Sequence, residues 1–135
     1  MNVFKLNFDI FITNYQSFKK IFSWQNANHI YLTSKNYDAA LASIDEYEDP
    51  DIRLKQAYQR IAYNEGVELY AERDFGRAIE YFDRSLKYRS NKEIASLSQY
   101  WKAESYYYKG AFDEAVKNYE AFIYSTGAAL TPYFN

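Results

Sequence analysis

The segment Tyr106–Phe122, with the sequence YYYKGAFDEAVKNYEAF, contains the pattern that decides the fold. Phe112 lies three residues before Ala115, and Tyr119 follows that alanine by four residues. This spacing places the three side chains on one face of a helix. Gly110 comes just before them and supplies the backbone freedom that a turn requires. The segment therefore predicts the end of one helix, a tight turn and the start of a second helix.

The same pattern occurs twice more, in Leu69–Ser85 (LYAERDFGRAIEYFDRS) and in Tyr31–Tyr47 (YLTSKNYDAALASIDEY). The alanines of the three segments, Ala40, Ala78 and Ala115, are separated by 38 and 37 residues. Self-similarity at such a period indicates a stack of helical hairpins. We therefore expect an all-α fold built from tandem antiparallel hairpins. The earlier segments have Tyr37 and Phe75 before the alanine, and Ile44 and Phe82 after it.

The second segment shows how such a hairpin closes. Arg73 and Asp74 interrupt the apolar spacing between its two helices. Asp74 can cap the following helix, because its carboxylate accepts hydrogen bonds from unpaired backbone N–H groups. Gly66 and Ala78 are small, which lets the two helices approach closely where they cross. The first unit has Asn28 in place of a small residue, so it is the least regular of the three.

This order of small residue, aromatic residue, turn, aromatic-x-x-Ala and second aromatic resembles the tetratricopeptide repeat. The spacings of 37 and 38 residues exceed the usual ~34 and are similar to those of bacterial envelope-associated tetratricopeptide proteins. The resemblance implies a right-handed α–α superhelix that serves as a non-catalytic protein-interaction scaffold. The likeness is carried by Gly66, Tyr70, Phe75, Ala78 and Phe82, and by Ala103, Tyr106, Tyr107, Gly110, Phe112, Ala115 and Tyr119.

The repeats divide residues 17–127 into units of about 17–50, 51–90 and 91–127. Residues 128–135 either begin a further helix or form a tail. No polar helix follows the third hairpin, although a solenoid normally requires such a cap. We therefore expect either a chain cut from a longer array or an end that pairs with another copy. The expected helices are Ser17–Ser34, Tyr37–Tyr47, Asp51–Glu72, Asp74–Tyr88, Lys92–Lys109 and Phe112–Tyr124.

The first 16 residues do not follow the repeat. Apolar Phe4, Leu6, Phe8, Ile10 and Ile12 alternate with other residues, and a period of two indicates a strand. A lone strand would have an exposed edge that invites pairing with a second chain. A helix here requires tertiary packing to override the local pattern. We keep helix, and strand or disorder, as alternatives for residues 1–16.

The aromatic composition of the 135 residues suits both packed seams between helices and hydrated binding surfaces. Aromatic residues make up 21%, and the net charge of −2 comes without a basic stripe, so we expect no nucleic-acid partner. No segment approaches the roughly 20 apolar residues that span a bilayer, so we expect no membrane insertion. The start of the chain is a poor signal peptide. The expected compartment is the cytoplasm or, following the resemblance, the bacterial periplasm or envelope.

Residues that could support catalysis are few. The chain has no cysteine, and His29 is its single histidine, so we expect no metal site and no cofactor. The acidic run 45–51 lacks the alternating oxygen ligands and central glycine of a calcium loop, and we interpret it as a solvated helix end. No phosphate-binding glycine loop is present. We therefore expect no enzymatic activity.

The remaining candidate is a surface, because in tetratricopeptide stacks the first helix of each hairpin lines a concave groove. An aromatic groove can hold an extended peptide or a helix by burying rings whose hydroxyls stay hydrated. We expect Tyr63, Tyr100 and Tyr108 to be exposed there, whereas Tyr70 and Tyr107 either face the groove or pack on a neighbouring helix. The resemblance places groove positions at Gln25, His29 and Leu32, at Arg60, Tyr63, Asn64, Val67 and Tyr70, and at Tyr100, Glu104, Tyr107 and Tyr108.

Some members of the family hold a peptide carboxylate with a clamp of Lys, Arg and Asn. At those places this chain has Gln25, His29, Asn64, Leu97 and Trp101, of which only Asn64 matches. Without the basic groups we expect no recognition of that type. The alternative function is a structural spacer within a longer solenoid, which self-associates, as a homodimer for example, through its uncapped ends.

Overall fold

The computed structural model describes residues 36–134. The helix expected at 17–34, the alternatives for residues 1–16, and positions Asn28, Gln25, His29 and Leu32 lie outside the described residues. Within residues 36–134 the secondary structure consists of five α-helices and one short 3-10 helix, with no strand. The all-α fold class is therefore confirmed over this range.

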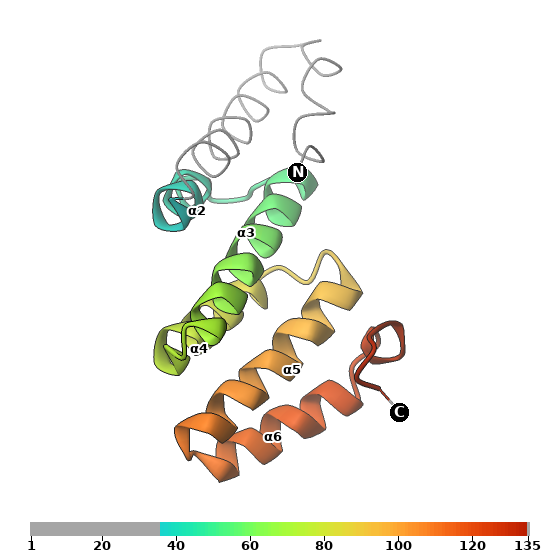
Figure 1. Ribbon diagram of the computed structural model, residues 1–135. Helices are drawn as coiled ribbons and strands as arrows, with labels where there is room; N and C mark the ends of the chain where they lie inside the picture. Colours follow the sequence, from blue (N-terminus) through green and yellow to red (C-terminus); the bar gives the residue numbers. More distant parts are fainter. Residues whose placement is uncertain (1–35, 135) are drawn as a thin grey trace, which may run out of the picture.

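The helices follow one another along the molecule in chain order (Figure 1). α3 packs on α4, α4 on α5 and α5 on α6, and α3 also touches α5. The short connections 72–74 and 110–111 join α3 to α4 and α5 to α6 as hairpins. The bounds are α2 Tyr37–Asp45, α3 Ile52–Ala71, α4 Phe75–Ser85, α5 Lys92–Lys109, α6 Phe112–Ile123 and the 3-10 helix η1 Ala128–Leu130.

The predicted starts of the helices agree with the structure because capping residues mark them. Asp74 caps α4, its carboxylate accepting a hydrogen bond from the Arg77 backbone N–H at 3.3 Å. Asp51 caps α3 in the same way and accepts from the Leu54 backbone N–H at 3.1 Å. Gly110 ends α5 in the left-handed conformation with φ 88°, which glycine adopts without steric cost.

Two predicted helices extend two or three residues too far at their C-terminal ends, and α3 and α6 end one residue earlier than predicted, at Ala71 and Ile123. α2 ends at Asp45 and not at Tyr47, and α4 ends at Ser85 and not at Tyr88. Tyr47 and Tyr88 nevertheless pack, partly buried, against the core. Their apolar spacing therefore reflects burial of the connecting segments and not continuation of the helices.

The acidic run 45–51 joins helices together in addition to capping α3. Asp45 forms ion pairs with Arg84 of α4 at 3.4 Å and with Lys87, which follows that helix, at 3.3 Å. Asp49 pairs with Lys55 at 3.6 Å. The two ion pairs of Asp45 help to hold α2 against α4.

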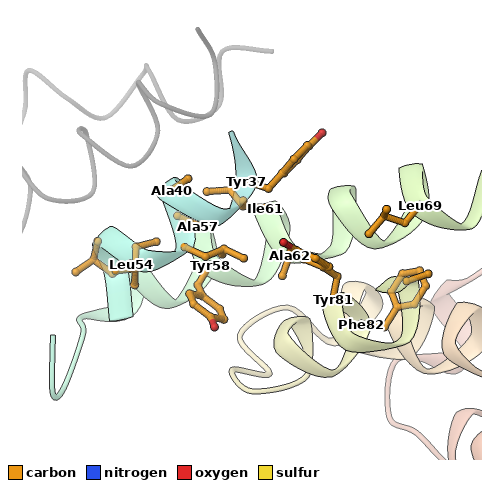
Figure 2. Packing of buried hydrophobic residues seen from close by; sticks show 13 residues of the cluster. Tyr37, Ala40, Leu54, Ala57, Tyr58, Ile61, Ala62, Leu69, Tyr81 and Phe82 are labelled. Atoms are coloured by element: carbon orange, nitrogen blue, oxygen red, sulfur yellow. The ribbon is translucent and has the colours of Figure 1, made fainter. Parts of the chain in front are cut away.

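The hydrophobic core lies between α2, α3 and α4 (Figure 2). Gly66 permits the close approach that its small size predicts, and its neighbour is the ring of Phe82, where an added β-carbon would lie 2.7 Å from Cε1. Ala78, the other small residue of this hairpin, is fully buried. Other fully buried side chains of the core are Leu41, Ile44, Leu54 and Ile61.

Candidate functional site

Aromatic side chains from α3, α5 and the segments next to them form one connected set of ring contacts. Residues 100, 104 and 108 are spaced by four along α5, so their side chains share one side of that helix. Residues 63, 67 and 70 are grouped in the same way on α3. The aromatic face, as we name it, consists of Tyr70, Phe75, Tyr100, Trp101, Glu104, Tyr108, Tyr119 and Tyr133.

Tyr70 links the two hairpins at this face. Its ring centroid lies 4.9 Å from that of Trp101, 5.5 Å from Phe75 and 6.2 Å from Tyr108. Phe75 and Tyr108 stack at 5.7 Å with an interplanar angle of 17°. Such ring pairs stabilise beyond the area they bury. The hairpins α3–α4 and α5–α6 are therefore held together by the same rings that a ligand would meet.

A shallow pocket of about 200 Å³ opens beside these rings. Its lining is formed by Tyr70, Ala71, Arg73, Phe75 and Tyr108. Arg73 is exposed at the α3–α4 turn, with φ 67°, and its guanidinium lies 5.7 Å from the Phe75 ring centroid. The pocket thus has aromatic walls and a cationic rim.

Glu104 of α5 is the acidic group of the aromatic face. Its carboxylate accepts a hydrogen bond from the Tyr119 hydroxyl of α6 and a second, at 3.5 Å, from the Tyr70 hydroxyl of α3. Burial, and then the negative charge of Glu104, raise the pKa of Tyr70 to about 12. For Tyr119, burial, the hydrogen bond to Glu104 and its charge raise the pKa further. Both tyrosines therefore remain protonated donors at physiological pH.

The segment after η1 covers one end of the aromatic face. The Tyr133 ring stacks on Tyr100 with centroids 4.2 Å apart and an interplanar angle of 3°. It also meets Trp101 edge to face at 5.4 Å. Gly127 anchors this segment, because an added β-carbon would lie 2.1 Å from the Lys92 carbonyl oxygen. The close packing of Gly127 on α5 directs the following residues back over the face.

The structure brings together four of the predicted groove residues, namely Tyr70, Tyr100, Glu104 and Tyr108. Tyr108 is 52% exposed, as expected. The expected exposure of Tyr63 and Tyr100 is wrong, since both are partly buried. Tyr100 lies under Tyr133, a contact that no local pattern indicates.

Tyr63 packs into the interior side of α3. Its ring centroid lies 6.2 Å from that of Phe82, and the Trp101 indole N–H donates to its hydroxyl. Burial raises the pKa of Tyr63, and the hydrogen bond from Trp101 opposes that rise. Tyr63 thus supports Trp101 from beneath the aromatic face.

The remaining predicted groove residues lie beside the face. Arg60, Asn64 and Val67 are partly exposed on α3, with Val67 packed against the core. Tyr107 is 50% exposed, and its ring meets Tyr108 at 5.4 Å and Phe112 at 5.5 Å. Tyr107 therefore packs on α6, which is the second of its two alternatives.

The expected groove omitted four members of the aromatic face: Phe75, Trp101, Tyr119 and Tyr133. Phe75 and Tyr119 are repeat positions, and their place in the pattern suggested core packing. Trp101 follows Tyr100 directly on α5, so the aromatic pair at 100–101 was the signal that could have found it. Tyr133 lies far along the chain from the rings it meets, and sequence spacing carries no signal for it.

A second group of exposed apolar residues lies on α6. Phe112, Val116 and Ile123 are 59%, 55% and 51% exposed. Their spacing places them on one side of the helix. No other helix among residues 36–134 covers that side.

Two negative findings apply to residues 36–134. No helix in this part of the chain has the length and apolar character needed to cross a bilayer. Within the same range, no three His, Asp or Glu side chains are grouped so that they could hold a metal ion.

Comparison with other proteins gives no relative for this chain. No protein-family model matches it, and neither a curated protein nor a solved structure matches it significantly.

Proposed function

We propose that the chain is a non-catalytic interaction module of the tetratricopeptide type, whose aromatic face binds a peptide segment of a protein partner. The observation that carries this proposal is the aromatic face itself, a ring surface shared by α3 and α5 with a pocket at its edge. The rings are held by contacts with one another, so little conformational entropy is lost on binding.

The repeat arrangement is supported by equivalent burial at equivalent positions. The pattern alanines Ala40, Ala78 and Ala115 are all buried, at 0%, 0% and 2% exposure. Phe75, the aromatic residue three positions before Ala78, stacks on Tyr108 of the next hairpin. A right-handed superhelix results if each hairpin is rotated on the one before it, as in tetratricopeptide stacks.

Aromatic anchors in well-packed pockets contribute most of the binding energy at protein interfaces. Tyr108 and Phe75 both line the pocket, and their rings stack on each other at 5.7 Å. A peptide side chain that enters the pocket would lie against these two rings and that of Tyr70 and would lose its water there. This arrangement favours recognition of one anchoring side chain over adhesion to a broad flat area.

The proposal is tested by selecting binders from a displayed library of random peptides and measuring their affinity for variants. Tyr108→Ser should weaken the selected peptides by about tenfold or more, as for a hot-spot aromatic residue. Tyr124→Ser is the matched control. Tyr124 follows the C-terminal end of α6, is 85% exposed and lies outside the aromatic face. Equal affinities for wild type and Tyr108→Ser, with helicity unchanged, would overturn the proposal.

A second candidate function is self-association, favoured by the exposed apolar side of α6. Two copies that pair through Phe112, Val116 and Ile123 would bury these side chains in an isologous interface. Sedimentation equilibrium should then show a dimer that Val116→Lys converts to a monomer. A monomer at all concentrations for the wild-type chain would exclude this function.

A further inference from the structure

Glu104 is surrounded by aromatic groups and carries a charge that no cation of the described chain neutralises. Two tyrosine hydroxyls donate to its oxygens, Tyr119 from α6 and Tyr70 from α3. Among residues 36–134, no lysine or arginine forms an ion pair with it. Hydroxyl donors stabilise a carboxylate without cancelling its charge, and about four acceptor positions are available on its two oxygens.

The nearby cations are engaged elsewhere. Lys102, two residues earlier on α5, pairs with Asp83 of α4 at 2.6 Å. Arg73 lies over the Phe75 ring at the far side of the pocket. Neither of these cations is therefore paired with Glu104 within residues 36–134.

The charge of Glu104 affects the pKa values of the tyrosines around it. Burial and then Glu104 raise the pKa of Tyr70 and of Tyr100. Burial and the contacts with Glu104 likewise raise the pKa of Tyr119.

The rings add a second attraction for a cation. The faces of tyrosine and tryptophan rings carry partial negative charge and attract ammonium or guanidinium groups within about 6 Å. Trp101 and Tyr108 lie with their ring centroids 4.9 and 6.2 Å from that of Tyr70. A carboxylate bordered by such rings is the arrangement that recognises an organic cation.

From this geometry we propose that the aromatic face binds the cationic end of a lysine or arginine side chain, with Glu104 as its counter-ion. The inference rests on the proposed function, since it names the residue of the bound peptide that the face selects. The cation would contact the free lone pairs of Glu104, while its aliphatic stem would lie on the rings. The pocket beside Tyr70 and Tyr108 would take the neighbouring apolar side chain.

The test compares two probes of almost equal shape, Nα-acetyl-arginine amide and Nα-acetyl-citrulline amide, which differ in charge. Binding is followed by NMR through the indole N–H of Trp101, with Trp24→Phe removing the second tryptophan signal. We expect saturable shifts with the arginine probe and an affinity for the citrulline probe about tenfold lower, as loss of a charge-assisted contact and a cation–ring contact implies.

Glu104→Gln should remove the preference for the arginine probe. Glu80→Gln is the control: it changes the same charge at an exposed site of α4, and the preference should remain. Equal affinities for the two probes on the wild-type chain would overturn the inference, whether or not Glu104→Gln folds. If both probes shift the Trp101 signal equally, the face still binds ligands, and only the cation preference fails. If the selected peptides also bind Tyr108→Ser as tightly as the wild type, the proposed function fails as well.

Discussion

Gly66 is a residue of α3 that leaves no room for a β-carbon. In Gly66→Ala the new atom would lie 2.7 Å from Cε1 and 2.8 Å from Cδ1 of Phe82, whose ring is fully buried. Overpacking of this kind costs about 1–3 kcal/mol, and the better helix propensity of alanine returns about 1 kcal/mol. We expect a net loss of about 0–2 kcal/mol in the free energy of unfolding, measured by urea denaturation.

Gly76 provides the matched control, since it lies in the first turn of α4 with no atom closer to an added β-carbon than Lys109 Nζ at 3.9 Å. Gly76→Ala should stabilise the fold by about 0.5 kcal/mol. Phe82→Leu combined with Gly66→Ala should recover part of the loss. If the two alanine variants stabilise the chain equally, Gly66 does not face Phe82.

Glu65 of α3 should make stability depend on pH. Burial, and then the neighbouring Glu68, raise its pKa from 4.5 to about 7, with Arg77 opposing the rise. Between these two pH values the folded chain keeps a proton that the unfolded chain has released. The contribution of Glu65 to stability is therefore fully present below pH 4.5 and is lost as the pH rises through about 7.

Glu65→Gln should accordingly stabilise the chain at pH 8 by on the order of 1 kcal/mol, a value discounted for the partial exposure of the group. The gain should shrink towards zero near pH 4.5, where the wild-type side chain is neutral as well. Thermal or urea unfolding of both proteins across this range measures it. A gain that is constant with pH would contradict the proposed cause.

At the scale of the elements, Gln59 fixes the connection between α4 and α5. This fully buried side chain donates from Nε2 to the Asn91 carbonyl oxygen at 3.1 Å and accepts from the Asn91 N–H at 2.9 Å. Asn91 in turn caps α5. The connection 86–91 is thus tied back to α3 by one side chain.

Gln59→Leu should cost about 1–3 kcal/mol, because it leaves the Asn91 N–H without its protein partner and removes one of the two donors to the Asn91 carbonyl oxygen, which still accepts from the Ala95 N–H. Gln56→Leu is an exposed change on the same helix and should stay within about 0.5 kcal/mol of wild type. Faster amide exchange at the start of α5 in Gln59→Leu would place the effect at the connection. Equal stability of the two variants would show that the Gln59–Asn91 contact contributes little.

The sequence predicts the elements best where one residue type has one physical role. Asp74 and Gly110 mark a helix start and a helix end because an aspartate carboxylate is a strong N-cap and glycine adopts the left-handed conformation without steric cost. The ends of α2 and α4 are less predictable. Tyr47 and Tyr88 continue the apolar spacing, yet their burial is achieved by a connecting segment that folds back on the core.

The candidate site is predictable only in part, because ring contacts join residues that are distant in sequence. Tyr100, Glu104 and Tyr108 are spaced by four on one helix, which is a local pattern, and the resemblance predicted them as groove residues. The stacking of Tyr133 on Tyr100 depends on how residues 127–133 pack against α5. Such non-local packing has no signature in the local pattern.

At the scale of the whole molecule, the contact of Tyr133 predicts how open the aromatic face is. Tyr133→Ala should expose Trp101 and Tyr100 at a cost of about 1 kcal/mol in stability. In a Trp24→Phe background, acrylamide should quench Trp101 fluorescence more strongly than in the parent chain. Phe134→Ala is the neighbouring control and should leave quenching unchanged, because no ring contact joins Phe134 to Trp101 in the described residues. Unchanged quenching in Tyr133→Ala would mean that the segment does not cover the face in solution.

The central claim is that the rings shared by α3 and α5 form the binding surface. Its most direct test is a set of intermolecular nuclear Overhauser effects between a peptide selected from the displayed library and the uniformly labelled chain. We predict contacts from the peptide to the rings of Tyr70, Trp101 and Tyr108, and to few protons elsewhere. Contacts confined to Val116 and Ile123 of α6 would contradict the claim and move the binding surface to the end of the stack.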